Sequence, residues 1–161
     1  TCIGEIYGKI KMGNPLMNKI LKGNWKGMRP YAFALDLLRN AGLRPTRQRL
    51  ALAKLLFENG DRHVTAEDLH SEARGVGISV SLATVYNTLH QFTQTGLLRE
   101  VVVESGRAYF DTNTTQHSHF FYEKSGRLLD VPAEAIKISQ FPPAPDGAEI
   151  AGIDVIVRID A

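Results

Sequence analysis

The sequence predicts an α+β protein in which an N-terminal winged helix-turn-helix domain is followed by a small α/β domain. Three observations lead to this fold class: four apolar patterns at helical spacing over residues 30–96, a β-hairpin pattern over residues 97–111, and three further strand patterns over residues 119–159. Helices followed directly by a hairpin are typical of the winged helix-turn-helix, which places its last helix in the major groove of DNA.

The helix boundaries follow from capping residues and apolar stripes. A first helix is expected to begin near Pro30 and to end at Asn40–Gly42. Thr46, Thr65 and Ser81 are the expected N-caps of three further helices, because apolar residues at spacings of three and four follow each of them. The expected ends of these helices are Asn59–Gly60, Gly75 with Gly77, and Gly96.

The strand patterns follow the helices. Leu97–Val103 and Arg107–Asp111 form the predicted hairpin around a turn at residues 104–106. In the second domain, strands are expected at His119–Phe121, Leu128–Val131 and within Ile150–Ile159, with at most short helices around Ala133–Ile138 and Asp146–Ala151. So small a sheet has exposed edges, and pairing with a second copy in a homodimer would cover them.

Composition and charge limit the classes of function. The chain has 161 residues, 43% hydrophobic and 22% charged, which is typical of a globular protein rather than a disordered or membrane-embedded one. Its one cysteine, Cys2, cannot form an internal disulfide or build a cysteine-based zinc site by itself. The net charge of +2 does not by itself indicate a nucleic-acid partner, but the charge is unevenly distributed along the chain.

That uneven charge divides the chain into three regions. Residues 1–29 hold six basic residues and one acidic residue without a sustained helical or strand period, so we expect a basic, disordered arm. Residues 30–113 hold nine of each sign and form the predicted DNA-binding domain, and residues 114–161, with four basic and seven acidic residues, form the predicted dimerisation and sensing domain. The arm lacks the continuous apolar segment of a secretory signal, so a cytoplasmic location is expected.

The fourth predicted helix, Ser81–Thr95, is the candidate for contact with DNA bases. At 100° per residue, Ala83, Thr84, Asn87 and Gln91 lie opposite its apolar stripe, with Tyr86 on the flank. Asn and Gln can bond adenine edges, and Thr and aromatic carbons can pack on a thymine methyl, which favours an A·T-rich target. The alternative is an amphipathic helix whose polar face meets only water, but the absence of Asp and Glu between residues 75 and 98 favours DNA.

Arginines near this helix are candidates for contacts with the DNA backbone, although each of them can equally be an ordinary exposed residue. The full set of predicted DNA-binding residues is Arg44, Arg47, Arg49, Ser81, Ala83, Thr84, Tyr86, Asn87 and Arg107.

Two histidines lie close together in the sequence. Residues two apart on a strand face the same side, so His117 and His119 can converge on one metal ion or one haem iron. The alternative is two surface histidines at the start of a strand. Followed by Glu123, the pair also matches part of a cupin-type two-histidine, one-carboxylate iron site, which defines a distant enzymatic alternative.

Several motifs in register resemble the ferric uptake regulator (Fur) family. They are residues 42–49 (GLRPTRQR), 63–69 (HVTAEDL), 81–89 (SLATVYNTL) and 117–121 (HSHFF). The match runs from about Leu35 to Val131. The resemblance implies a homodimeric transcription regulator, not an enzyme, with a winged-helix domain, a C-terminal dimerisation domain, and a response to metal or haem.

The chain also departs from the family pattern. Where many relatives carry a Cys-x-x-Cys pair, this chain has residues 122–125 (YEKS), so no four-cysteine structural zinc site is expected. In lacking this pair, the chain resembles the iron response regulator (Irr) branch of the family. That resemblance implies haem as regulatory ligand and a haem-delivering protein as partner. The Cys-Pro haem motif of some members is missing, because Ile3 follows Cys2.

The resemblance also implies ligands. Carried over by position, the regulatory metal site of the family falls on His63, Asp111, His119 and Asp130, a set of donors suited to Mn²⁺, Fe²⁺ or Zn²⁺. Without the resemblance, these are a loop histidine and ordinary carboxylates at strand ends.

A second metal site of the family would need acidic residues at Ser118 and Lys137. Their absence frees His117 for haem, together with His119.

The leading expectation is therefore an iron- and haem-responsive regulator of A·T-rich inverted-repeat operators. A metal-corepressed or peroxide-sensing repressor, and a DNA-binding module without any sensory site, are the alternatives within the same fold.

Overall fold

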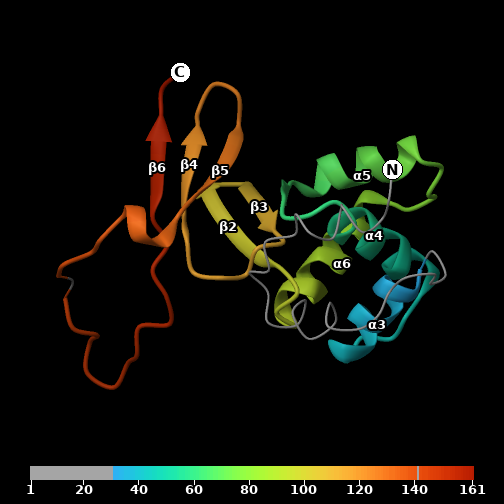
Figure 1. Ribbon diagram of the computed structural model, residues 1–161, viewed down its shortest axis with the longest axis horizontal. Helices are drawn as coiled ribbons and strands as arrows, with labels where there is room; N and C mark the ends of the chain where they lie inside the picture. The colour runs from blue at the N-terminus through green and yellow to red at the C-terminus, as the bar shows by residue number, and fades with distance from the viewer. Residues whose placement is uncertain (1–30, 141) are drawn as a thin grey trace. The chain divides into compact units, whose positions relative to one another are not determined.

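The computed structural model describes residues 31–140 and 142–161, and these divide into two compact units (Figure 1). The first unit ends at Thr115 and the second begins at Gln116. The predicted basic arm over residues 1–29 lies outside the described residues. No helix in the described part of the chain is long and apolar enough to cross a membrane.

The first unit contains the four predicted helices. They are α3 (Ala32–Asn40), α4 (Arg47–Phe57), α5 (Ala66–Gly75) and α6 (Leu82–Gln94). The three predicted N-caps are confirmed, because the side chains of Thr46, Thr65 and Ser81 each accept a hydrogen bond from the backbone N–H three residues later. Thr65 also forms a capping box with Asp68.

The wing is a three-stranded antiparallel sheet in the order β1-β3-β2. Strands β2 (Arg99–Glu104) and β3 (Arg107–Asp111) are the predicted hairpin. Strand β1 (His63–Val64) pairs with the end of β3, so His63 lies in a short strand and not in a loop, which was the alternative for this residue. Two residues are too few to show a strand pattern in the sequence.

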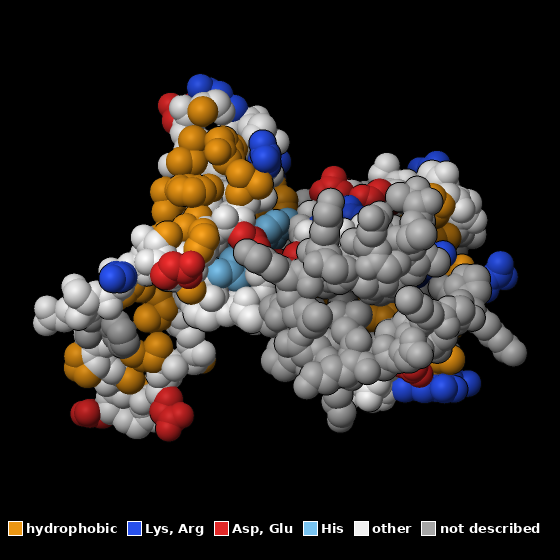
Figure 2. Space-filling view, in the orientation of Figure 1, with side chains coloured by type: hydrophobic (Ala, Val, Ile, Leu, Met, Phe, Trp, Pro, Cys, Tyr) orange, Lys and Arg blue, Asp and Glu red, His pale blue; other side chains and the backbone are white. Residues whose placement is uncertain are grey.

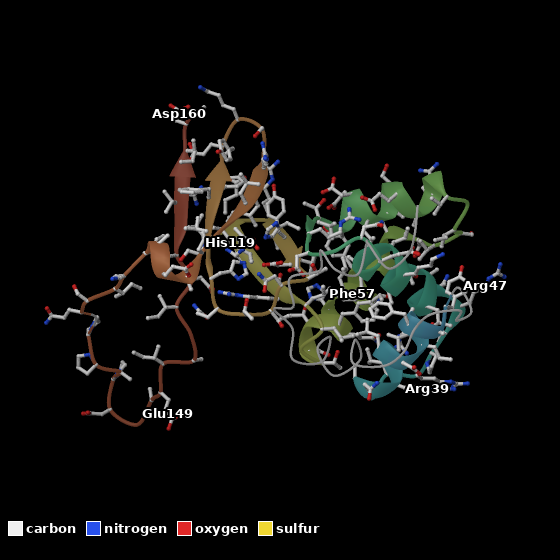
Figure 3. All side chains as sticks on the ribbon, in the orientation of Figure 1. Arg39, Arg47, Phe57, His119, Glu149 and Asp160 are labelled. Carbon is white, nitrogen blue, oxygen red and sulfur yellow. The ribbon has the colours of Figure 1, made fainter. Side chains whose placement is uncertain are left out.

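The core of the first unit lies between its helices and β3. Phe57 of α4, Phe92 of α6 and Phe110 of β3 are fully buried, and the rings of Phe57 and Phe92 lie 6.3 Å apart (Figure 3). The predicted buried face of α6 is confirmed at Val85, Leu89 and Phe92, whereas Leu82 is only partly buried. Burial of these side chains fixes which face of α6 remains exposed.

The second unit is a three-stranded sheet in the order β5-β4-β6. Strands β4 (Ser118–Tyr122) and β5 (Arg127–Val131) are antiparallel, and β6 (Ile156–Ile159) runs parallel to β4. Hydrophobic side chains gather over these strands (Figure 2). Phe120, Leu129 and Val157, which share one register position, are half-buried.

The connection between β5 and β6 agrees with the prediction of at most short helices. Its described residues contain one short 3₁₀ helix, Ala133–Ala135, and residues 146–151 form no helix. Gly147 has a left-handed φ of 77°, and three prolines between residues 142 and 145 remove backbone donors. The last strand lies within the predicted Ile150–Ile159, and its ladder pairing with β4 starts at Ile156.

Truncation of Phe92 tests the packing of α6. Phe92→Ala removes a fully buried ring, so the free energy of unfolding should fall by about 3–5 kcal/mol. Urea unfolding followed by circular dichroism measures this change. The matched control is Val76→Ala at a 63% exposed position, which should stay within about 0.5 kcal/mol of the unsubstituted protein. Equal effects of the two substitutions would contradict the described core.

Candidate DNA-binding helix and metal-binding residues

The exposed face of α6 presents small, polar and aromatic side chains. Ala83, Tyr86, Asn87 and His90 are exposed, and Thr84 is partly exposed. The opposite face is buried in the core, so this ridge is the part of α6 that a DNA major groove can contact. Ser81, also among the predicted DNA-binding residues, is the N-cap of the helix and bonds the Thr84 hydroxyl at 2.8 Å.

Gln91, predicted on the same polar face of α6, is occupied by a contact with another helix. It is half-buried, and its Oε1 accepts hydrogen bonds from Arg49 Nε at 3.0 Å and Arg49 Nη2 at 2.6 Å. Arg49 Nη1 also donates to the Arg44 carbonyl at 2.9 Å. This arginine therefore links α4 to α6. The two bonded residues are 42 positions apart in the sequence, so the apolar period within one helix cannot predict their contact. Its contact with the DNA backbone stays a prediction.

The other predicted backbone-contacting arginines are exposed. Arg44 and Arg47 lie on either side of the N-cap of α4, and Arg47 points away from the helix (Figure 3). Arg107, in the wing, lies 3.2 Å from Glu104 through Nη1 and Oε1. Such an exposed pair contributes little to stability, so Arg107 can exchange Glu104 for a phosphate.

Tyr86 is held by residues outside α6. Its hydroxyl donates a hydrogen bond to Glu67 Oε1 of α5 at 2.7 Å, and its ring stacks on His90 with centroids 6.4 Å apart. The hydrogen bond to Glu67, followed by desolvation and the negative charge of Glu67, raises the pKa of Tyr86 above its ordinary value. The phenol therefore stays protonated, and able to donate, to higher pH than a free tyrosine.

Glu67→Gln tests this contact in solution. The amide keeps an acceptor oxygen but removes the negative charge, so the pKa of Tyr86 should fall toward its ordinary value. The measurement is an alkaline titration of ¹³Cζ-labelled tyrosine by NMR, with the Tyr86 signal assigned from Tyr86→Phe. Glu58→Gln, at an exposed residue that pairs with Lys54, should leave the titration unchanged. An unaltered Tyr86 titration in Glu67→Gln would mean that the hydrogen bond is absent in solution.

In the first unit, β1 and β3 bring together one imidazole and one carboxylate. His63 and Asp111 are register partners, and His63 Nε2 lies 3.4 Å from Asp111 Oδ2. Asp111 is fully buried, and its other oxygen accepts the Asn113 N–H at 2.8 Å. Thr112 and Arg62 extend the pairing, with Thr112 N–H donating to the Arg62 carbonyl at 3.1 Å and Arg62 N–H to Thr112 Oγ1 at 2.8 Å.

In the second unit, three donors converge. His117 Nε2 and His119 Nε2 lie 3.2 Å and 3.7 Å from the same oxygen, Asp130 Oδ1. The two rings are 4.4 Å apart, both are buried, and His119 projects from β4 (Figure 3). The register explains this placement, because His119 of β4 is paired with Asp130 of β5. His117 and His119 therefore lie together beside one carboxylate, and their role as ligands stays a prediction.

The spacing within each group suits a metal ion. An ion bound at roughly 2.0–2.2 Å by an imidazole nitrogen and a carboxylate oxygen leaves those two atoms roughly 3.0–3.5 Å apart. The distances of 3.4 Å in the first unit and 3.2 Å in the second agree with that range. His117, which is not in the metal-ligand set that the family resemblance implies, therefore joins the metal-donor candidates. Glu123, the carboxylate of the cupin alternative, instead lies 3.5 Å from Arg158.

Comparisons with known proteins agree with this fold. The model of the ferric uptake regulator family matches residues 40–157. The peroxide operon regulator of Bacillus subtilis is 36% identical over 97 residues, which cover 60% of this chain and 66% of that protein. The ferric uptake regulation protein of Shigella flexneri is 34% identical over 104 residues, which cover 64% of this chain and 70% of that protein.

A solved structure extends the similarity to three dimensions. The ferric uptake regulator of Pseudomonas aeruginosa, determined with manganese, aligns with a TM-score of 0.61 at 28% identity, covering 80% of this chain and 97% of that one. The predicted order of a winged-helix DNA-binding domain followed by a dimerisation domain is thereby confirmed. The chain belongs to the ferric uptake regulator family of metal- or peroxide-responsive transcription regulators.

Proposed function

We propose that this protein is a metal-dependent repressor that binds A·T-rich inverted-repeat operators as a homodimer. The observation that carries the proposal is the convergence of His117 and His119 on one oxygen of Asp130, with His63 and Asp111 forming a second donor pair. Together these side chains offer three imidazoles and two carboxylates, a donor set suited to Mn²⁺, Fe²⁺ or Zn²⁺.

One divalent ion is proposed to take ligands from both groups. His63 and Asp111 belong to the unit that carries α6, and His117, His119 and Asp130 belong to the unit that carries the proposed dimer interface. An ion shared between the units would restrict their relative orientation and so the spacing of the two α6 helices in a dimer. Because operator half-sites lie about one helical turn apart, that spacing governs DNA affinity.

The exposed ridge of α6 supports the DNA part of the proposal. Asn87 can make a bidentate contact with adenine, and the ring of Tyr86 can pack on a thymine methyl, which together favour A·T pairs. Arg44, Arg47 and Arg107 are exposed and are proposed to contact phosphates.

Haem sensing by His117 and His119, with delivery by a partner protein, is the alternative proposal. Imidazole is a common axial ligand of haem iron, and two imidazoles lie side by side in this unit. However, both rings are buried, and the cavity beside His117 has a volume of only about 220 Å³. That is below the roughly 300 Å³ typical of a small-molecule pocket, so the described residues favour an ion over a porphyrin.

The proposal predicts that metal increases operator affinity. Fluorescence anisotropy of an A·T-rich inverted-repeat duplex at fixed salt should show Kd lowered roughly tenfold by Mn²⁺ and restored by chelator. His119→Ala and Asp130→Asn should abolish this metal response, because the first removes an imidazole donor and the second removes the negative charge of the carboxylate. The matched control is His70→Ala on α5, a histidine outside both donor groups, which bonds the Val80 carbonyl and should retain the response.

Three other outcomes would contradict the proposal. Release of the duplex by haem, accompanied by a Soret band that disappears in His117→Ala, would assign the site to haem sensing. Release by peroxide from the Fe²⁺-loaded protein would assign it to peroxide sensing. Affinity that is indifferent to metal, chelator, haem and peroxide would leave a DNA-binding module without a sensory site.

A further inference from the structure

The exposed tyrosine of α6 is held from two sides. Its ring stacks on His90 at an interplanar angle of 23°, and the edge of His90 meets Phe110 of β3 with centroids 5.7 Å apart. At the other end of the side chain, the hydroxyl donates to Glu67 Oε1 at 2.7 Å. Contacts from the wing and from α5 thus fix both the plane of the Tyr86 ring and the direction of its O–H bond.

The hydrogen bond to Glu67 determines whether the Tyr86 hydroxyl can donate a hydrogen bond to a base or only accept one. A phenol has one hydrogen to donate, and in this structure that hydrogen is directed at Glu67. The phenolic oxygen then retains only acceptor capacity, and an ionised carboxylate is also only an acceptor. The side chains of Tyr86 and Glu67 together therefore present acceptors and no donor.

Base edges in the major groove differ in whether they can donate a hydrogen bond to the side chains of Tyr86 and Glu67. Adenine and cytosine each present an amino donor there, whereas guanine and thymine present acceptors at O6 and O4. We propose that Glu67 is a specificity-determining residue that acts through Tyr86, so that the contacted strand must carry adenine or cytosine at the position facing the Tyr86 hydroxyl, next to any thymine on which the ring packs. This inference rests on the proposed binding of α6 in the major groove.

The charge of Glu67 supports a role in selectivity rather than in affinity. Glu67 is exposed in the first turn of α5, where its hydrogen bond brings a carboxylate beside the proposed DNA-contacting ridge. A carboxylate near phosphates weakens binding to every sequence alike. It improves discrimination only where it opposes the wrong bases more strongly than the right ones.

A double-mutant cycle tests the inference. The unsubstituted protein, Glu67→Ala, Tyr86→Phe and the double variant are titrated against operators that carry A, C, G or T at each position of the half-site. The unsubstituted protein should prefer adenine or cytosine at one position by roughly 5- to 150-fold. Glu67→Ala frees the Tyr86 hydroxyl to donate and removes a negative charge. Affinity should therefore rise most for the duplexes that carry guanine or thymine at this position, so that the ratio falls toward one.

The Tyr86→Phe background shows whether Glu67 affects base preference through Tyr86 or by direct contact with the base. In Tyr86→Phe no hydroxyl is present, so adding Glu67→Ala should change all affinities equally and leave the base ratio unchanged. A ratio that changes in this background would show that Glu67 reads the base itself and would overturn the inference. Glu58→Ala is the charge-matched control and should leave the ratio as in the unsubstituted protein, since Glu58 pairs with Lys54 at 3.8 Å.

The failures of the two proposals are distinguishable. If the unsubstituted protein binds no duplex with or without metal, the proposed function fails and this inference fails with it. If it binds with a base preference that Glu67→Ala leaves intact, only the role of Glu67 is overturned. Circular dichroism and thermal unfolding of each variant show whether a lost preference reflects an unfolded protein.

Discussion

The antiparallel pairing of β1 with β3 is the constraint on which the first unit depends. It joins residues 63 and 64, immediately before the N-cap of α5, to the end of the wing at Asp111. The helix-turn-helix and the wing are thereby anchored to the same strand, and His63 is placed opposite a buried carboxylate. The same pairing thus places both the donor pair and the start of α5.

In the second unit, the pairing register of β4 and β5 positions the donor side chains. The pairing of His119 with Asp130 across β4 and β5 aligns a buried imidazole with a carboxylate, and His117, just before β4, reaches the same oxygen. Taking donors from adjacent strands of a sheet holds them in place before any ligand arrives, which lowers the entropy cost of binding an ion. The described residues between β5 and β6 form no α-helix, only the 3₁₀ helix Ala133–Ala135. We propose that the half-buried apolar side chains of this sheet contribute to the homodimer interface.

Local features were predictable from the sequence, and features created by tertiary contacts were not. The caps at Thr46, Thr65 and Ser81 and the turn of the hairpin depend on residues a few positions apart, so pattern alone located them. The contact of Gln91 with Arg49 and that of Tyr86 with Glu67 join different helices, and no period within one helix reveals them. Glu67 also lies outside the acid-free segment of residues 75–98, and only folding brings its carboxylate to α6.

The stoichiometry of metal binding tests the proposal that both donor groups bind one ion. Isothermal titration of the full chain with Zn²⁺ should give one high-affinity ion per chain, and His63→Ala and His119→Ala should each abolish that same binding event. His90→Ala, which alters an exposed histidine of α6 outside both groups, should bind as the unsubstituted protein does. Two ions per chain, one lost in each of the first two variants, would show independent sites and contradict the account.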